Sequence, residues 1–248
     1  MACCLRGMPD MNVILFGATG MVGQGVLREC LLDSEVESVL SIGRNAIEQQ
    51  HEKLQQIVLK TLTDLSPVES RLSGYDACFF CLGVSSAGMS EEDYRHVTYD
   101  LTLSVAATLV RLNPAMTFVY VSGAGTDSSE HGRMMWARIK GKTENALLAM
   151  PFKAAYMFRP GYIQPMHGVR TKTQWYGTMY AIISPLYPLL KRLFPGYVTS
   201  TEQLGRAMIS VAKTSATKRV LESNDINAIS AKSLLGTDGA APTSNLNH

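Results

Sequence analysis

The segment from Asn12 to Gly23 constrains the fold more than any other part of the chain. Its first five residues, up to Phe16, are largely apolar and predict a buried strand. Three glycines follow in the spacing G-x-x-G-x-x-G, and the apolar periodicity after them predicts a helix that ends near Asp33. A strand that passes through a glycine turn into a helix is the first unit of an alternating α/β fold.

This glycine turn has the features of a dinucleotide phosphate site. Gly17 would allow the tight turn, Gly20 would let the backbone approach a phosphate, and Gly23 would let the helix pack closely on the strand. The amides at the helix N-terminus would face the anion. The spacing differs from the usual G-x-G-x-x-G of dehydrogenases, and a packing turn without phosphate is the alternative. The predicted pyrophosphate site comprises Gly17, Ala18, Thr19, Gly20, Met21, Val22 and Gly23.

The rest of the chain continues the alternation of strands and helices. A capping box at Ser90 begins a predicted long helix that ends near Asn113. Six strands separated by helices predict a Rossmann-type, doubly wound parallel sheet of the α/β class. The later strands are predicted over residues 36–42, 56–62, 77–82, 117–121 and 154–158, the later helices over 133–150 and 201–213, and a short edge strand over 219–221.

Ligands bind such sheets at the carboxyl ends of the strands. Arg44 follows the second strand, where a basic residue accommodates a 2′-phosphate, so it favours NADP over NAD; an exposed loop arginine is the alternative. Asp64 follows the third strand, near the expected adenine, although it also suits the cap of a short helix. The predicted cofactor contacts at these strand ends are Arg44, Asp64, Leu65, Cys81, Leu82 and Gly83.

Composition limits the classes of function. A chain of 248 residues with 46% hydrophobic content can bury one sizeable core and a small second lobe. The net charge is +2, the charged fraction is 18% and there is no basic block, so we expect a small-molecule substrate and no nucleic-acid surface. The five histidines do not stand at metal-ligand spacing, and no metal site is predicted.

The five cysteines are predicted to be free thiols. Their odd number and the lack of a secretory signal indicate a reducing compartment, and a cytoplasmic location is predicted. Cys78 and Cys81 match C-x-x-C but lie on a predicted strand, where positions three apart point to opposite faces. A disulfide or a shared metal is therefore not expected. Cys3 and Cys4 precede the fold on a predicted loose arm, with lipidation as the alternative.

The sequence pattern changes between Tyr162 and Tyr197. This apolar, aromatic stretch is interrupted by Pro185 and Pro188, and it is too short and too broken to span a bilayer. It predicts a substrate lid or a subunit interface, which leaves room for a homo-oligomer; a peripheral membrane contact is the alternative. The predicted organisation is a flexible arm over 1–10, a dinucleotide-binding core over 11–161, a small substrate lobe with elements that return to the core over 162–235, and a mobile tail over 236–248.

An ordered set of motifs points to a known family. In their order along residues 11 to 230 these motifs resemble the short-chain dehydrogenase/reductase superfamily. The resemblance is to its atypical or extended, epimerase-like branch, which includes nucleotide-sugar epimerases and the Tat-interacting protein of 30 kDa. It implies NAD(P) binding, with Lys140 and Pro160 as further cofactor contacts. The motifs are the glycine turn, Gly43-Arg44, Cys81-Leu82-Gly83, Ser122-Gly123-Ala124, Lys140-Gly141 and Arg159-Pro160-Gly161.

The resemblance also implies two catalytic residues. In that superfamily a serine at the end of the fifth strand positions the substrate oxygen, and a Tyr-x-x-x-Lys pair on the next helix transfers the proton. Ser122 takes the serine place and Lys140 the lysine place. The ammonium of such a lysine can hold the nicotinamide ribose hydroxyls and lower the pKa of a neighbouring phenol.

The tyrosine place is occupied by Trp136, whose indole N–H cannot act as a general acid or base at physiological pH. Three explanations remain open. Another hydroxyl, from Tyr94, Tyr99 or Tyr162, supplies the proton; or the cofactor site serves sensing or scaffolding without turnover; or Trp136 stacks on a flat substrate in a redox reaction that needs no such acid.

The sequence thus predicts an NADP-dependent oxidoreductase or epimerase-like enzyme that acts on a small carbonyl or alcohol, with a flat or apolar substrate. The alternative is a non-catalytic NADPH-sensing or protein-binding module of the same fold. A serine hydrolase that uses Ser122 and His131 is disfavoured, because the sequence around Ser122 lacks the G-x-S-x-G elbow.

Overall fold

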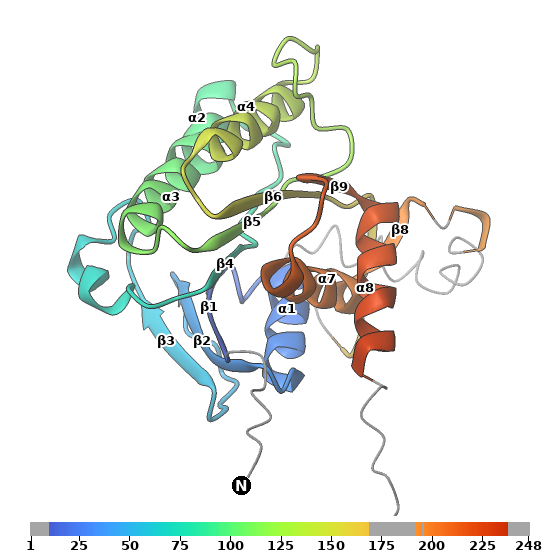
Figure 1. Ribbon diagram of the computed structural model, residues 1–248. Helices are drawn as coiled ribbons and strands as arrows, with labels where there is room; N and C mark the ends of the chain where they lie inside the picture. The colour runs from blue at the N-terminus through green and yellow to red at the C-terminus, as the bar shows by residue number, and fades with distance from the viewer. Residues whose placement is uncertain (1–9, 169–191, 195, 238–248) are drawn as a thin grey trace, which may run out of the picture.

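The computed structural model describes residues 10–168, 192–194 and 196–237. Its centre is a sheet in the order β3-β2-β1-β4-β5-β6-β9, with parallel pairing throughout (Figure 1). The predicted doubly wound, Rossmann-type sheet is confirmed, and its strand order reverses between β1 and β4, where such sheets bind ligands. The strands are β1 (Met11–Phe16), β2 (Val36–Gly43), β3 (Leu54–Val58), β4 (Ala77–Phe80), β5 (Thr117–Val121), β6 (Ala154–Arg159) and β9 (Val220–Glu222).

Helices cover both faces of the sheet. On one face lie α1, α7 and α8, and on the other lie α2, α3 and α4 (Figure 1). A 3-10 turn, η1, precedes β4, and a π turn, η2, joins α2 to α3. The bounds are α1 (Met21–Leu32), η1 (Ser66–Arg71), α2 (Glu91–Arg95), η2 (His96–Asp100), α3 (Leu101–Leu112), α4 (Met135–Ala149), α7 (Thr201–Thr214) and α8 (Ser223–Thr237).

Alternation along the strands divides the apolar side chains between two cores. In β1, Val13 packs in the core under α1 and α7, whereas Ile14 packs in the core under α3 and α4. Cys78 belongs to the second core and Cys81 packs against the first, so the two thiols face opposite sides of the sheet as predicted. Both are free cysteines, and burial raises the pKa of each thiol. The C-x-x-C sequence is therefore part of the packing.

The third strand ends earlier than the sequence predicts. It covers Leu54–Val58 rather than 56–62, because its partner β2 ends at Gly43. The last bond between the two strands runs from the Leu59 amide to the Gly43 carbonyl at 2.9 Å. Leu62 is nevertheless buried in the loop that follows, and this burial explains the apolar signal beyond the end of the strand.

The predicted long helix is interrupted by the π turn. Its start is confirmed, since the Ser90 hydroxyl accepts a hydrogen bond from the Asp93 amide at 3.1 Å. Its end is confirmed at Leu112, immediately before Asn113. The π turn widens one turn of the helix and shifts the apolar face, so Val97 of the predicted apolar series is 37% exposed.

Helix α7 crosses α1 at close range. A side chain on Gly25 would begin 3.0 Å from the carbonyl oxygen of Thr201, and one on Gly205 would begin 2.7 Å from Cγ of Glu29. Arg206 of α7 donates from Nε to the buried Glu29 carboxylate at 3.0 Å. These contacts join the C-terminal part of the chain to the helix that follows the glycine turn.

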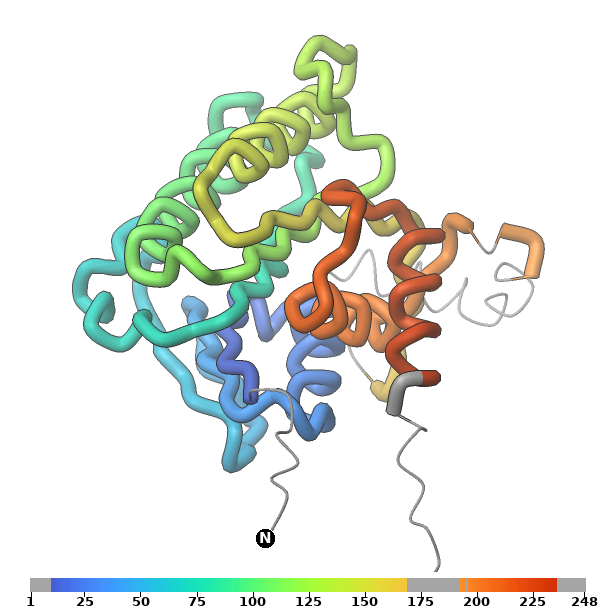
Figure 2. The backbone as a smooth tube through the Cα atoms, in the orientation of Figure 1, coloured from blue at the N-terminus to red at the C-terminus, as the bar shows by residue number. Residues whose placement is uncertain are grey.

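The C-terminal part returns to the main body (Figure 2). Strands β7 (Tyr162–Gln164) and β8 (Val198–Ser200) form a separate parallel pair, and β9 lies beside β6 at the edge of the main sheet. The sequence does not predict α8, because this helix is rich in serine and asparagine and Ile226 is one of its few buried apolar residues. The predicted tail that begins at Gly236 therefore overlaps the end of α8.

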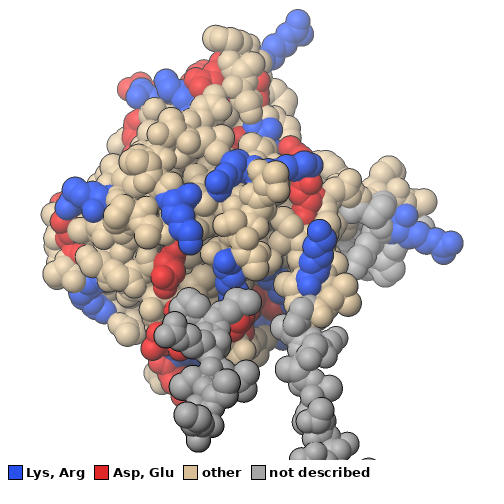
Figure 3. All heavy atoms as spheres, viewed as in Figure 1, with Lys and Arg blue, Asp and Glu red and all other residues tan. Residues whose placement is uncertain are grey.

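Several predicted segments lie outside the described residues. They are residues 1–9 of the predicted arm, residues 238–248 of the predicted tail, and most of the apolar stretch that was assigned to a lid, a subunit interface or a membrane contact. Among the described helices, none combines the length and the apolar character needed to cross a bilayer. On the face shown in Figure 3, the described basic and acidic side chains are interspersed.

Candidate functional site

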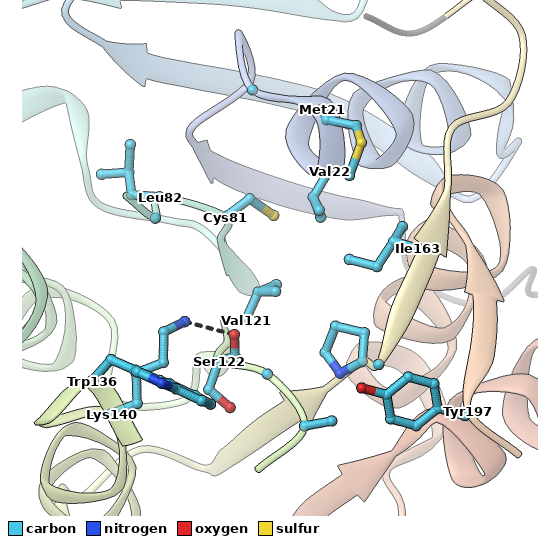
Figure 4. A pocket seen from close by; sticks show the side chains of 16 residues that line it. Met21, Val22, Cys81, Leu82, Val121, Ser122, Trp136, Lys140, Ile163 and Tyr197 are labelled. Carbon is cyan, nitrogen blue, oxygen red and sulfur yellow. Dashed lines mark hydrogen bonds between the residues drawn. The ribbon is translucent and has the colours of Figure 1, made fainter. Parts of the chain in front are cut away.

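A pocket of about 410 Å³ lies at the carboxyl ends of β1, β4, β5 and β6. This is the edge where the sequence predicts the site, and the pocket includes the point where the strand order reverses. Its wall is mainly apolar, and Lys140 is its one charged residue within the described part of the chain (Figure 4). The lining residues are Gly20, Met21, Val22, Cys81, Leu82, Gly83, Val121, Ser122, Gly123, Ala124, Trp136, Lys140, Pro160, Gly161, Ile163 and Tyr197.

The glycine turn has geometry that other residues would not allow. Gly17 has φ of +83°, and a side chain on it would begin 2.7 Å from the Cys81 carbonyl. Gly23 lies over the turn itself, where a side chain would begin 2.6 Å from the carbonyl carbon of Gly17 and 2.9 Å from Cα of Ala18. The turn therefore lies close to both the end of β4 and the first turn of α1.

The start of α1 suits an anion. Gly20 is the N-cap and no described side chain caps the helix, so its first amides lack the usual side-chain acceptor. The first turn contains no acidic residue that would repel a phosphate. Across the pocket, a side chain on Gly83 would meet nothing within 4 Å, so the loop after β4 leaves space. These residues fit the pyrophosphate of a dinucleotide.

Lys140 lies on α4 and reaches the pocket beside the end of β5. Its Nζ donates to the carbonyl oxygen of Ser122 at 2.6 Å and lies 5.9 Å from the centre of the Tyr120 ring (Figure 4). Burial lowers the pKa of Lys140 to about 8, partly offset by the nearby Glu144 carboxylate. Lys140 is therefore still mainly protonated at physiological pH. The hydrogen bond to the Ser122 carbonyl holds its ammonium in place.

Ser122 is in the pocket wall, but its hydroxyl is engaged elsewhere. The Oγ donates to the Glu144 carboxylate and also lies 3.2 Å from the Phe158 carbonyl. Figure 4 shows the backbone carbonyl of Ser122 toward Lys140 and the hydroxyl turned away from it. The predicted role of the hydroxyl in holding a substrate oxygen would require it to leave Glu144. What Ser122 offers in this arrangement is its carbonyl, which positions the lysine.

Behind the pocket lies a buried ion pair. Glu144 has no exposed surface, and it accepts hydrogen bonds from Nε of Arg159 at 3.0 and 3.1 Å and a further one from Nη2. Arg159 is 12% exposed and also donates to the Ser128 hydroxyl at 2.5 Å. The pair with Glu144 raises the pKa of Arg159. The pair ties α4 to the ends of β5 and β6, two of the strands that form the pocket.

We expect a Glu144→Gln variant to lose about 3 kcal/mol of unfolding free energy, because it leaves the largely buried Arg159 guanidinium with only the more distant carboxylate of Glu222, 3.7 Å away, as a counter-charge. The matched change Glu69→Gln removes a carboxylate that pairs with Arg111 at 2.8 Å on the surface, and it should lower stability far less. Urea unfolding of the two variants measures the difference. Equal losses in both variants would contradict the structural role of the buried pair.

Trp136 lines the pocket one helical turn before Lys140, as the spacing predicts. Its ring is half-buried and lies over the loop after β5, where Cη2 is 3.4 Å from the position of a side chain on Gly125. The indole thus forms a flat part of the wall beside the ammonium (Figure 4).

The three tyrosines proposed from the sequence as alternative acids do not line this pocket. Tyr94 is 2% exposed and its pKa is raised by burial. Tyr99 faces two cations, with Lys142 at 5.2 Å and Arg95 at 5.8 Å from its ring centre.

Tyr162 donates its hydroxyl to Oε1 of Gln164 at 2.9 Å. The described tyrosine that does line the pocket is Tyr197, immediately before β8. The sequence gives no signal for it, because the long apolar stretch separates it from every other residue of the site. Its position depends on the pairing of β7 with β8, which is a tertiary contact.

The predicted contacts at the adenosine end lie outside the pocket. Arg44 is exposed at the end of β2, next to β1, and makes no hydrogen bond or ion pair with other described residues. Asp64 accepts a hydrogen bond from the Ser66 amide at 2.9 Å, and bonds from Ser66 lower its pKa. This bond forms a local turn at the start of η1, whose N-cap residue is Leu65. Leu65 is a core residue, 3% exposed. In residues 10–168 and 196–237 no group of acidic, His and Cys side chains could hold a metal ion.

No protein-family model matches the chain. Individual proteins of similar sequence do match it. Protein FMP52, mitochondrial, of Eremothecium gossypii is 27% identical over 222 residues, which cover 87% of this chain and 96% of that protein. Protein HTATIP2 of Rattus norvegicus is 26% identical over 161 residues, which cover 63% of this chain and 64% of that protein.

Solved structures share the fold. The Helicobacter pylori ADP-L-glycero-D-manno-heptose-6-epimerase superposes with a TM-score of 0.63 at 15% identity, covering 94% of this chain and 85% of that one. The Bordetella bronchiseptica enzyme WbmF, solved in complex with NAD⁺, gives 0.62 at 14% identity, covering 95% and 81%. The resemblance to the extended, epimerase-like branch is confirmed.

The prediction of a cytoplasmic location is wrong. The FMP52 relatives are named mitochondrial proteins. The physical reason for the error is that free thiols and the lack of a secretory signal separate a reducing interior from the secretory pathway, but do not distinguish one reducing compartment from another.

Proposed function

We propose that this chain, which has the fold of the extended short-chain dehydrogenases/reductases and is related to FMP52 and HTATIP2, binds a nicotinamide dinucleotide and reduces a small, flat carbonyl compound. One observation carries the proposal. The glycine turn and the half-buried cation of Lys140 face the same pocket of about 410 Å³, at the edge of the sheet where cofactors bind.

The chain would hold the dinucleotide along the carboxyl edge of the sheet. The pyrophosphate would bind at the start of α1, beside Gly20, Met21 and Val22. The Arg44 guanidinium would bind a 2′-phosphate. Lys140 would bind the ribose hydroxyls next to the reacting ring. When bound, the cofactor supplies hydride; the protein supplies orientation and electrostatics.

The pocket wall also suggests the kind of substrate. Trp136 offers a flat aromatic surface, and Met21, Val22 and Ile163 exclude water from the opposite side. The ammonium of Lys140 would stabilise negative charge that develops on a carbonyl oxygen. A planar carbonyl compound with little charge matches this wall better than a sugar, which would need many polar partners.

We expect an Arg44→Ala variant to bind NADPH about tenfold more weakly and NADH as wild type does, because only NADPH carries the phosphate that a guanidinium recognises. Isothermal titration calorimetry with both nucleotides measures this. Arg71→Ala, which removes another exposed arginine, on η1, is the matched control and should change neither affinity. Equal weakening of NADPH and NADH in the Arg44 variant would remove the basis for NADP preference.

One observation favours the alternative of a non-catalytic, NADPH-sensing module. The Ser122 hydroxyl is bonded to Glu144, and Trp136 stands in the tyrosine place, so neither usual proton-handling group is available. Such a module would bind NADPH in the same pocket but would reduce no carbonyl probe. Single-turnover oxidation of bound NADPH, followed by its absorbance, separates the two functions.

The names of the FMP52 relatives support a mitochondrial location for this chain. Fractionation of cells that express the tagged protein tests it, with recovery outside mitochondria as the contradicting result.

A further inference from the structure

The site on α4 lacks a hydroxyl that could deliver a proton. Trp136 stands one turn before Lys140, and the Ser122 hydroxyl is bonded to Glu144. Within the described residues, one phenol lines the same pocket from the opposite side, that of Tyr197. Figure 4 shows its ring across the pocket from Trp136 and Lys140, with the hydroxyl directed toward them.

We propose that Tyr197 is a catalytic residue that donates a hydrogen bond, and then a proton, to the carbonyl oxygen of the substrate. This inference rests on the proposed reductase function. It replaces the three tyrosines suggested by the sequence with one from the segment before β8, and it moves the proton donor from the helix that carries Lys140 to the facing wall of the pocket.

The backbone on both sides fixes Tyr197. Its amide donates to the Phe194 carbonyl at 3.0 Å, and its own carbonyl accepts from the Tyr162 amide at 3.0 Å and from the Ser223 hydroxyl at 3.2 Å. The ring lies against Gly161, where a side chain would begin 2.8 Å from Cδ2 and Cε2. The absence of a side chain at Gly161 therefore makes the space in which the ring stands at the pocket.

The proposed step balances without another reactant. When bound, the reduced nicotinamide dinucleotide would supply hydride to the carbonyl carbon. As the π bond to oxygen breaks, Tyr197 would give its phenolic proton to that oxygen. The product is an alcohol, and the phenolate recovers its proton from water. Tyr197 is 58% exposed, so water reaches the ring and proton exchange with solvent is direct. Lys140 stabilises the negative oxygen before the proton arrives.

Ligand binding without turnover tests the contact. Wild type, Tyr197→Phe and the control Tyr162→Phe are each saturated with NADP⁺, which cannot supply hydride, and titrated with 9,10-phenanthrenequinone, a flat aromatic dicarbonyl. Quenching of tryptophan fluorescence, measured in a Trp175→Phe background for all three proteins, reports binding beside Trp136. We expect Tyr197→Phe to weaken the probe about fivefold through loss of one hydrogen bond. The Tyr162 hydroxyl is bonded to Gln164, so the control should bind as wild type does.

Rates with NADPH complete the test. Tyr197→Phe should lower kcat for the probe by about 100-fold through loss of general-acid catalysis, while its affinity for NADPH stays at the wild-type value. Unchanged probe affinity and kcat in Tyr197→Phe, or equal losses in the Tyr162 control, would overturn the inference and leave the reductase function standing. Wild-type protein that binds NADPH but not the probe would also overturn it. Wild-type protein that binds no nucleotide would overturn the proposed function itself.

Discussion

A Gly23→Ala variant is expected to lose about 100-fold in affinity for NADPH and NADH alike, because a displaced turn no longer aims its amides at the pyrophosphate. The added methyl group would lie 2.6 Å from the carbonyl carbon of Gly17 and 2.9 Å from Cα of Ala18. Both atoms are backbone, so relief requires movement of the turn away from α1. A flexible side chain could move aside cheaply, but a backbone atom cannot.

The matched control for this substitution is Gly43→Ala. A side chain at Gly43 would first meet the Asn45 carbonyl oxygen at 3.6 Å, an ordinary van der Waals distance. Calorimetric titration of both variants with each nucleotide, after circular dichroism has established that they are folded, separates a local effect on the turn from unfolding. Wild-type affinity in a folded Gly23→Ala protein would show that the turn does not hold the pyrophosphate.

A Lys140→Met variant is expected to reduce 9,10-phenanthrenequinone about 1,000-fold more slowly than wild type, since it removes the cation that faces the developing oxyanion. Methionine keeps most of the side-chain volume. Lys142→Met, two residues further along α4 and exposed beside the Tyr99 ring, is the matched control and should keep the wild-type rate. Steady-state kinetics measure both, and a rate in Lys140→Met close to that of the control would refute the assignment.

The pH dependence of kcat/KM should also differ between wild type and Lys140→Met. The folded-state pKa of Lys140 is lowered to about 8, so the ammonium is present below that pH and is lost above it. For wild type, kcat/KM should therefore fall as pH rises above about 8, and in Lys140→Met this limb should be absent. The free energy of unfolding of the wild type should change with pH in the opposite direction. Burial of the charge destabilises the folded protein below pH 8, and this cost disappears as pH rises toward the ordinary lysine pKa.

Local patterns predicted the part of the site that comes from neighbouring residues. The turn from Gly17 to Gly23 follows a strand directly, and Trp136 and Lys140 share a helix face through their spacing, so each could be inferred without tertiary contacts. The strands and helices of the sheet could also be predicted locally, because apolar residues repeat with different periods in strands and in helices.

The orientation of Ser122 could not be inferred in this way. It depends on Glu144 and Arg159, which lie 22 and 37 residues away and meet only in the folded core. The place of Tyr197 likewise depends on the pairing of β7 with β8 across the apolar stretch. Helix α8 was missed for another reason, since its apolar residues are spread around the helix and so give no periodic signal on which helix prediction could rest.

The close crossing of α1 and α7 makes the pocket sensitive to substitutions that lie outside it. The glycine turn leads directly into α1, and α7 begins directly after β8, four residues beyond Tyr197. Gly25 and Gly205 let the two helices pack closely, so the same helix pair supports the wall of the proposed cofactor site and the wall that carries the Tyr197 phenol. A natural variant at either glycine would touch no ligand, yet it would misalign two reactants at once and resemble an active-site mutation in its kinetics.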